Sequence, residues 1–324
     1  MLIQIVAFLC GLFFIVKGAD WLVDGSSAVA KRLGISDFVI GLTIVGMGTS
    51  APEMVVSFIG AIKGNADIAI GNVMGSNIFN VMLILGITAV ICPMTITSLN
   101  RKKDIPINIL ITVLLLGLGM THKLFGFGTD TLSRFEGALF LLLFAIYIYM
   151  SFRYDVPDEN PSDDGEKPVS GGKAALMIII GLAGLILGGQ LFVNSATNIA
   201  KMIGVSDKFI AITILAGGTS MPELATCIVA AAKKKGQLAL GNILGSNVFN
   251  VLLILGGSAL IHPLSFAAIN YVDAVALLMS ALFIAISIYT FKRDKLDHGD
   301  GIGLLLMDAA YMTWLIKKKK KKSK

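Results

Sequence analysis

Two carboxylates stand inside long apolar segments of this chain. Glu53 closes the sequence GTSAPE, and Glu223 closes the sequence GTSMPE. Proline has no N–H to donate, so the carbonyl groups of Gly48 and Gly218, four residues before each proline, lose their helical partner. Non-helical backbone at membrane depth survives only where it is buried in protein or lines a cavity. Because a charge at the bilayer centre costs at least about 2.5–3.5 kcal/mol, the repeated carboxylate favours a functional site.

The same motif also fits a structural role. Ser50 and Glu53 have the spacing of a capping box, in which a serine caps a helix and a glutamate three residues later returns the hydrogen bond. A glutamine at position 53 would serve this purpose without a buried charge. We therefore favour the functional interpretation and keep the helix cap as the alternative.

A second pair of polar motifs follows, GNVMGSNIFN at residues 71–80 and GNILGSNVFN at residues 241–250. Polar residues four apart share one face of a helix. Gly71 and Gly75 form a small-xxx-small pair, which predicts close contact between helices. We expect the glycines to permit that approach while Ser76 and Asn80 present oxygen atoms toward Glu53. The residues of the two polar faces are Asn72, Ser76 and Asn80, and Asn242, Ser246 and Asn250.

The polar groups of these motifs are oxygen donors. They have no conveniently placed cysteine or histidine, which disfavours zinc and copper. A bendable all-oxygen site with two negative charges suits Ca²⁺, whereas Mg²⁺ demands stricter octahedral geometry. Na⁺ accepts the same ligands, and the carboxylates could instead bind protons. The donors are the carboxylates of Glu53 and Glu223, the hydroxyls of Thr49, Ser50, Thr219 and Ser220, and the amide oxygens of Asn80 and Asn250.

The composition is that of a polytopic membrane protein. Hydrophobic residues make up 55% of the 324 residues and charged residues 15%, against about 25% charged in soluble proteins. Apolar segments of about 20 residues recur, the length that crosses a bilayer as a helix, and they lack the alternation of a transmembrane barrel. The net charge of +6 becomes 6 − 7 = −1 without the seven lysines that follow residue 316, so no nucleic-acid partner is expected.

The chain consists of two homologous halves. Residues 41–93 and 211–263 align without a gap at an offset of 223 − 53 = 170, and about half of the aligned positions are identical. We predict a first five-helix repeat at 1–152, an acidic linker rich in Pro, Gly and Ser at 153–172, a second five-helix repeat at 173–316 and a lysine-rich tail at 317–324. The ten predicted spans are 2–24, 38–62, 67–92, 105–121, 134–152, 174–199, 208–232, 237–262, 271–290 and 301–316.

An odd number of crossings in each half predicts that the halves insert with opposite orientation. Lys and Arg residues gather in the loops after the odd-numbered spans, which the positive-inside rule makes cytoplasmic. The expected protein is an all-α, multi-pass protein of the cell (inner) membrane, with a cytoplasmic linker and both termini outside. The lysine tail opposes this placement.

Asp20 and Asp24 fall near the cytoplasmic end of the first span, where we expect solvated side chains and consider a gating role.

The paired G-T-S-x-P-E and G-S-N-x-x-N motifs resemble the α-repeats of the sodium/calcium exchanger family of cation/calcium antiporters, in its prokaryotic type. The resemblance extends over nearly the whole chain, including GADWLV at residues 18–23. It implies ten helices in two inverted repeats and alternating access. The expected partners are inorganic cations and the lipid bilayer, with no obligate protein partner evident, and no cofactor is expected apart from the transported Ca²⁺ and Na⁺. It also implies that the protein is a transporter and not an enzyme.

The resemblance carries the ion ligands over residue by residue. It adds the backbone oxygens of Gly46 and Ala216, and the metal ion itself is expected to contact Glu53, Glu223, Thr49 and Thr219. The full set of implied ion-binding residues is Gly46, Thr49, Ser50, Glu53, Ser76, Asn80, Ala216, Thr219, Ser220, Glu223, Ser246 and Asn250.

One departure from the family pattern bears on the coupling ion. Sodium-exchanging members often carry Asp in place of one of the two asparagines, whereas Asn80 and Asn250 are both amides here. The Thr-Ser pair of each motif favours sodium, because proton-coupled relatives typically lack it. We therefore expect exchange of Ca²⁺ for Na⁺, with Ca²⁺/H⁺ exchange through the same glutamates as the alternative. A membrane-embedded enzyme needs unlike carboxylate environments, and a channel filter uses rings of equivalent groups, so both are disfavoured.

Overall fold

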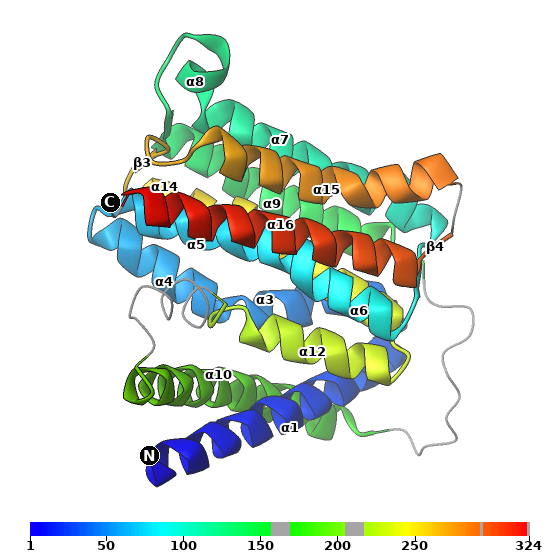
Figure 1. The fold of residues 1–324 in the computed structure, drawn as a ribbon. Helices are drawn as coiled ribbons and strands as arrows, with labels where there is room; N and C mark the ends of the chain where they lie inside the picture. The colour runs from blue at the N-terminus through cyan, green and yellow to red at the C-terminus, as the bar shows by residue number, and fades with distance from the viewer. Residues whose placement is uncertain (157–168, 205–216, 292–293, 323–324) are drawn as a thin grey trace.

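The structure, a computed structural model, describes residues 1–156, 169–204, 217–291 and 294–322, and it is a bundle of helices (Figure 1). In the first half, the elements are α1 (Leu2–Leu33), α2 (Asp37–Ile40), the π-helix η1 (Gly41–Val45), α3 (Gly46–Thr49), α4 (Ala51–Ile62), α5 (Ala66–Phe79), the π-helix η2 (Asn80–Leu85), α6 (Gly86–Ile91), β1 (Met94–Thr95), the π-helix η3 (Asn100–Asp104), α7 (Ile105–Gly119), α8 (Thr121–Phe125), β2 (Thr131–Leu132) and α9 (Arg134–Arg153).

The second half repeats much of this order. Its elements are α10 (Gly171–Met202), α12 (Met221–Ala232), α13 (Gly236–Val248), the π-helix η5 (Phe249–Leu255), α14 (Gly256–Ile261), β3 (Leu264–Ser265), α15 (Tyr271–Phe291), β4 (Lys295–Leu296) and α16 (His298–Lys322).

Within the described residues, six helices are long and apolar enough to cross a membrane. A seventh candidate is the broken helix made of Asp37–Thr49 and Ala51–Ile62, whose two parts are bent by 49°. The bend falls at the GTSAPE motif, where proline removes a helical hydrogen bond. The prediction of a break at this point is therefore confirmed. The six helices long enough to cross a membrane are α1, α9, α10, α15 and the continuous segments Ala66–Ile91 and Gly236–Ile261.

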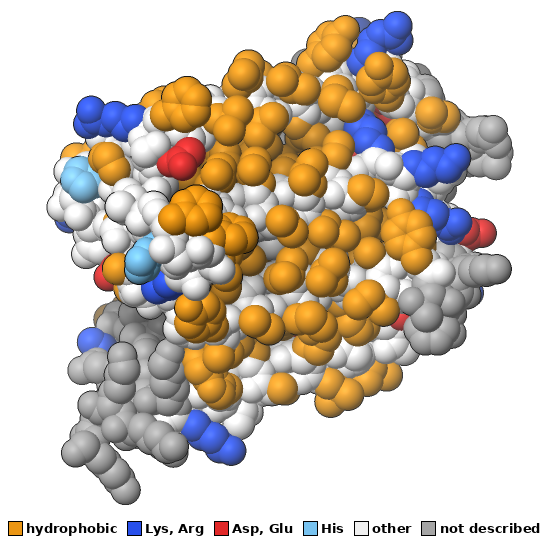
Figure 2. All heavy atoms as spheres, turned by 90° about the horizontal axis from the view of Figure 1, so that it is seen from above, with side chains coloured by type: hydrophobic (Ala, Val, Ile, Leu, Met, Phe, Trp, Pro, Cys, Tyr) orange, Lys and Arg blue, Asp and Glu red, His pale blue; other side chains and the backbone are white. Residues whose placement is uncertain are grey.

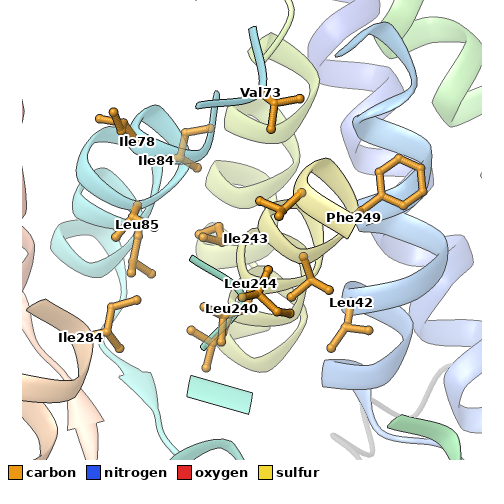
Figure 3. Close-up of a cluster of buried hydrophobic side chains, with 14 of the residues drawn as sticks. Leu42, Val73, Ile78, Ile84, Leu85, Leu240, Ile243, Leu244, Phe249 and Ile284 are labelled. Atoms are coloured by element: carbon orange, nitrogen blue, oxygen red, sulfur yellow. The ribbon is translucent and has the colours of Figure 1, made fainter. Parts of the chain in front are cut away.

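The helices α13 and η5 form the centre of the bundle. Leu240, Ile243 and Leu244 of α13 are buried among Leu42 of η1 and Leu85 of η2 (Figure 3). A Cβ atom on Gly241 would collide with the backbone oxygen of Phe38, so glycine allows α13 to cross α2 at backbone contact. This crossing brings the second polar motif of one half against the broken helix of the other half.

The helices α1 and α10 form a separate pair on one side of the bundle (Figure 1). Glycines line their contact, and a Cβ atom on Gly18 would lie 2.7 Å from the carbonyl oxygen of Gly181. The pair packs on the rest of the molecule mainly through contact of α1 with α12. Small residues that let backbones approach are typical of helix pairs in membranes.

Two short strand pairs mark the two ends of the bundle. At one end β1 pairs with β4, and at the other β2 pairs with β3, both antiparallel. The N-terminus and the end of α16 both lie at the β3 end, whereas α10 begins at the opposite end (Figure 1). Figure 2 shows hydrophobic side chains across the middle of one face, with most of the visible Lys and Arg side chains toward the two ends.

Candidate functional site

The two glutamates lie in the first turns of α4 and α12. Glu53 is 0% exposed and Glu223 is 1% exposed. The structure brings them near enough for electrostatic repulsion between the two carboxylates. Within the described residues, no ion pair joins a Lys or Arg side chain to either glutamate. Two buried carboxylates without a cationic side chain create a strong demand for a bound cation or protons.

Serine hydroxyls connect each carboxylate to the opposite half of the chain. Ser50 Oγ donates to Glu223 Oε1 at 2.8 Å, and Ser220 Oγ donates to Glu53 Oε1 at 2.9 Å. Ser76 Oγ adds a third bond to Glu53 Oε1 at 3.3 Å. The helix-cap alternative for GTSAPE is wrong, because the Ser50 side chain makes no cap bond to α4 and instead crosses to Glu223.

The threonines of the motifs lie beside the same carboxylates. The Thr49 hydroxyl is close enough to interact with Glu223, and the Thr219 hydroxyl with Glu53. Thr49 Oγ1 also lies within hydrogen-bond distance of two acceptors, the Gly46 carbonyl oxygen at 3.4 Å and Asn242 Oδ1 at 3.2 Å. Each carboxylate therefore has a threonine and a serine from the opposite motif around it.

Of the two predicted backbone ligands, the structure describes only Gly46. The Gly46 carbonyl oxygen accepts a hydrogen bond from Ser246 Oγ at 3.2 Å and another from the Ser50 N–H at 3.2 Å. It is thus occupied by protein donors in this structure. Ala216 lies outside the described residues.

Four buried oxygen atoms of the site have no hydrogen-bond partner among the described residues. The amide nitrogens of Asn80 and Asn250 are both used as donors, at 3.2 and 2.9 Å, but their oxygens are not used as acceptors. One carboxylate oxygen of each glutamate also has no hydrogen-bond partner among the described residues. Buried polar atoms without partners are uncommon in native proteins and point to a missing ion or water. The four atoms are Glu53 Oε2, Glu223 Oε2, Asn80 Oδ1 and Asn250 Oδ1.

Three buried asparagines take part in the site without having been singled out as ligands. Asn242 accepts from Thr49, and its Nδ2 donates to Cys227 Sγ at 3.2 Å. Asn77 and Asn247 hold the amide nitrogens of Asn250 and Asn80. Asn77 and Asn247 directly follow Ser76 and Ser246 in the repeated GSN triplet, and this shared position is the signal that could have identified them.

The donor set defines what the site can bind. The described residues contain no group of three or more His, Cys, Asp and Glu side chains that could hold a metal ion. The charge of the site therefore comes from two carboxylates, and all further donors are neutral oxygens. Such a set favours hard cations over zinc or copper.

Comparison with known proteins agrees with this chemistry. A family model described as sodium/calcium exchanger protein matches residues 3–153 and 173–317. The chain belongs to the sodium/calcium exchanger family.

Full-length relatives of this exchanger family include both named and solved proteins. The putative antiporter CaxA of Alkalimonas amylolytica is 37% identical over 320 residues, covering 96% of this chain and 98% of CaxA. The sodium/calcium exchanger MaX1 of Methanosarcina acetivorans is 32% identical over 341 residues, covering 95% of this chain and 97% of MaX1. A solved structure of the sodium-calcium exchanger NCX_Mj superimposes with a TM-score of 0.81 at 30% identity, covering 98% of each chain.

These matches establish the general class of this exchanger-family protein. It is a multi-pass membrane protein, and the relatives described above are named as exchangers or as a putative antiporter, not as enzymes.

Proposed function

We propose that this protein exchanges Ca²⁺ for Na⁺ across the membrane, with both ions bound in turn at Glu53 and Glu223. The observation that carries the proposal is the set of four partnerless oxygens, one on each glutamate and one on each of Asn80 and Asn250. Carboxylate and amide oxygens are the ligands that Ca²⁺ prefers. The neighbouring hydroxyls of Thr49, Ser50, Ser76, Thr219, Ser220 and Ser246 supply further neutral oxygens.

The charge of the site supports exchange rather than simple binding. Two buried carboxylates are costly when both are ionised and empty, because nothing compensates their charge. One Ca²⁺ or more than one Na⁺ removes this cost. The empty protein, with two uncompensated charges, therefore resists the conformational change between its outward-open and inward-open states. The forms loaded with Ca²⁺ or Na⁺ do not. Obligatory counter-transport follows from this difference.

We also propose the membrane arrangement that the repeats predict. Ten crossings in two inverted five-helix halves would place related sites from the two halves face to face near the midplane. The reciprocal bonds from Ser50 to Glu223 and from Ser220 to Glu53 support this pseudo-symmetry. The protein would lie in the cell (inner) membrane with its linker in the cytoplasm.

Exchange of Ca²⁺ for protons is a second candidate. Asn80 and Asn250 are both amides, so the site lacks the additional carboxylate that sodium-exchanging relatives often carry. Two glutamates that bind two protons would balance one Ca²⁺ without Na⁺. The direct test of coupling therefore compares a sodium gradient with a proton gradient.

Radiolabelled Ca²⁺ uptake into proteoliposomes tests the proposal. Vesicles loaded with Na⁺ are compared with vesicles made acidic inside, and Glu53→Gln is measured beside the unaltered protein. We expect uptake driven by internal Na⁺ and its loss in Glu53→Gln, since the variant removes half of the site's charge. Uptake driven by the proton gradient alone would contradict exchange with Na⁺ and support exchange of Ca²⁺ for protons. Absence of uptake under both gradients by folded protein would overturn the assignment of Ca²⁺.

A further inference from the structure

Asn77 and Asn247 form a buried cross-connection between the two halves beside the proposed ion site. They are 2% and 5% exposed, and they occupy equivalent positions in the two repeats, since 247 − 77 = 170. Asn250 Nδ2 donates to Asn77 Oδ1 at 2.9 Å, and Asn80 Nδ2 donates to Asn247 Oδ1 at 3.2 Å. Each asparagine thus holds the amide nitrogen of the ligand residue that belongs to the other half.

The orientation of Asn77 is fixed by a backbone group. Asn77 Nδ2 donates to the carbonyl oxygen of Asn247 at 3.2 Å. A carbonyl oxygen only accepts hydrogen bonds, so the nitrogen of Asn77 must point toward it. The oxygen of Asn77 then faces Asn250, and it can accept only from the nitrogen of that side chain. Two consecutive bonds therefore determine which way the Asn250 amide is turned.

The bond to Asn77 determines where the amide oxygen of Asn250 points. With its nitrogen held by Asn77, Asn250 Oδ1 is directed away from Asn77, and it is one of the four oxygens without a partner. A cation accepts the oxygen of an amide as a ligand but repels the positive end of its NH₂ group. The same side chain turned around would present the wrong atom to the ion.

We propose that Asn77 is a positioning residue that keeps the amide oxygen of Asn250 turned toward the cation site. The proposal rests on the cation-binding function proposed above. Asn77 does not touch the ion and acts through Asn250. Asn247 holds Asn80 in the same sense from the other half, through the bond between Asn80 Nδ2 and Asn247 Oδ1.

A purely structural role for Asn77 is the competing explanation, and the chain offers a matched control for it. Asn108 is also buried, at 6% exposure, and its Nδ2 donates to the carbonyl oxygen of Leu244 at 3.2 Å. It therefore joins α7 to α13 as Asn77 joins α5 to α13, but it holds no ligand side chain of the site. Loss of either amide removes a buried hydrogen bond from its nitrogen to a backbone carbonyl of α13. Loss of Asn77 also removes the bond that holds Asn250.

The test measures Ca²⁺ uptake by Asn77→Leu and Asn108→Leu in proteoliposomes, separating the KM for Ca²⁺ from the maximal rate. We expect the KM to rise about tenfold in Asn77→Leu, since one charge-assisted ligand is lost, and to stay unchanged in Asn108→Leu. Asn77→Ala is the second variant where the leucine variant does not fold. An unchanged KM in folded Asn77 variants, or an equal rise in Asn108→Leu, overturns the positioning role.

A double variant supplies a readout that a structural role would not move. Asn250→Asp presents an oxygen to the ion whichever way the side chain is turned, because both of its terminal atoms are oxygens. Adding Asn77→Leu to Asn250→Asp should therefore raise the KM less than twofold, although the same change raises it about tenfold beside Asn250. Equal effects in both backgrounds overturn the proposal. Failure of the unaltered protein to take up Ca²⁺ overturns the proposed function as well, whereas normal uptake with unaffected Asn77 variants overturns only the positioning role.

Discussion

Asp104 is a buried carboxylate outside the proposed ion site. It lies immediately before α7 and is 1% exposed, and Lys103 Nζ is 3.8 Å from its Oδ1. Burial raises the pKa of Asp104 to about 6, although Lys103 and a hydrogen bond from Asn100 act in the opposite direction. The hydroxyl of Tyr147, which interacts electrostatically with Asp104, is also buried. The folded state therefore favours the protonated form of Asp104 more than the unfolded state does.

Replacing Asp104 should stabilise the protein at neutral pH and not in acid. The folded-state pKa of about 6 lies above the unfolded value of 3.8, so folding takes up a proton between these values and stability falls as pH rises through them. Two pKa units correspond to roughly 3 kcal/mol. We expect Asp104→Asn to raise the thermal midpoint at pH 7.5 and to leave it unchanged near pH 4, measured in detergent. The exposed Asp67, changed to Asn, is the control and should show no such pH dependence.

At the scale of elements, an ion-pair cluster joins α1 to the end of α12. Lys233 Nζ lies 2.5 Å from Asp20 Oδ1 and 2.7 Å from Asp24 Oδ1. Burial disfavours the charged form of Lys233, but the hydrogen bonds to the two aspartates outweigh it and the pKa of Lys233 is raised. At neutral pH, below the unfolded value, Lys233 is therefore positively charged. The equivalent residues of the other half are Lys63, Gln190 and Asn194, and in the described part of the chain no ion pair joins them.

Removing this cluster should loosen α1 rather than unfold the protein. The three side chains are between 29% and 43% exposed, and partly exposed ion pairs contribute about 0–1 kcal/mol. We expect Lys233→Gln to change the thermal midpoint little and to broaden the distance distribution between spin labels at residues 33 and 234. The repeat-equivalent Lys63→Gln should leave that distribution unaltered. An unchanged distribution in Lys233→Gln would show that helix packing alone holds α1 in place.

The elements that were predictable from the sequence are those governed by local chemistry. The break at Pro52 and the positions of most described spans followed from proline and from hydropathy. Two helices continue well past a predicted end. Helix α1 continues past residue 24 to Leu33, where Gly34, with a φ of 65°, ends it. Helix α16 continues through Lys317–Lys322, because lysine is a good helix former. The crossed bonds of Ser50 and Ser220, and the role of Asn77, were not predictable. Helical periodicity assigns a residue to a face, but only packing decides which residue of another helix it meets.

At the scale of the whole molecule, different Lys and Arg side chains lie at the two ends of the bundle. The end that carries β1 and β4 also carries Arg101, Lys103 and Lys233, which bind Asp294, the Met150 carbonyl oxygen and the Asp20–Asp24 pair. The opposite end carries β2, β3 and Lys123, whose ammonium group donates to three backbone carbonyls. By the positive-inside rule, the first end is expected in the cytoplasm. The lysine-rich end of α16 lies at the second end (Figure 1) and opposes this orientation.

Accessibility of single cysteines distinguishes the two orientations. Thr129, between α8 and β2, and Ser170, before α10, are both exposed and lie at opposite ends of the bundle. In a background without Cys10, Cys92 and Cys227, we expect Thr129→Cys to react with a membrane-impermeant thiol reagent in intact cells. Ser170→Cys should react only after the cells are permeabilised, because the distributed Lys and Arg residues of the short loops outweigh a single charged terminus. The opposite pattern would place the linker outside and would mean that the lysines of α16 determine the orientation.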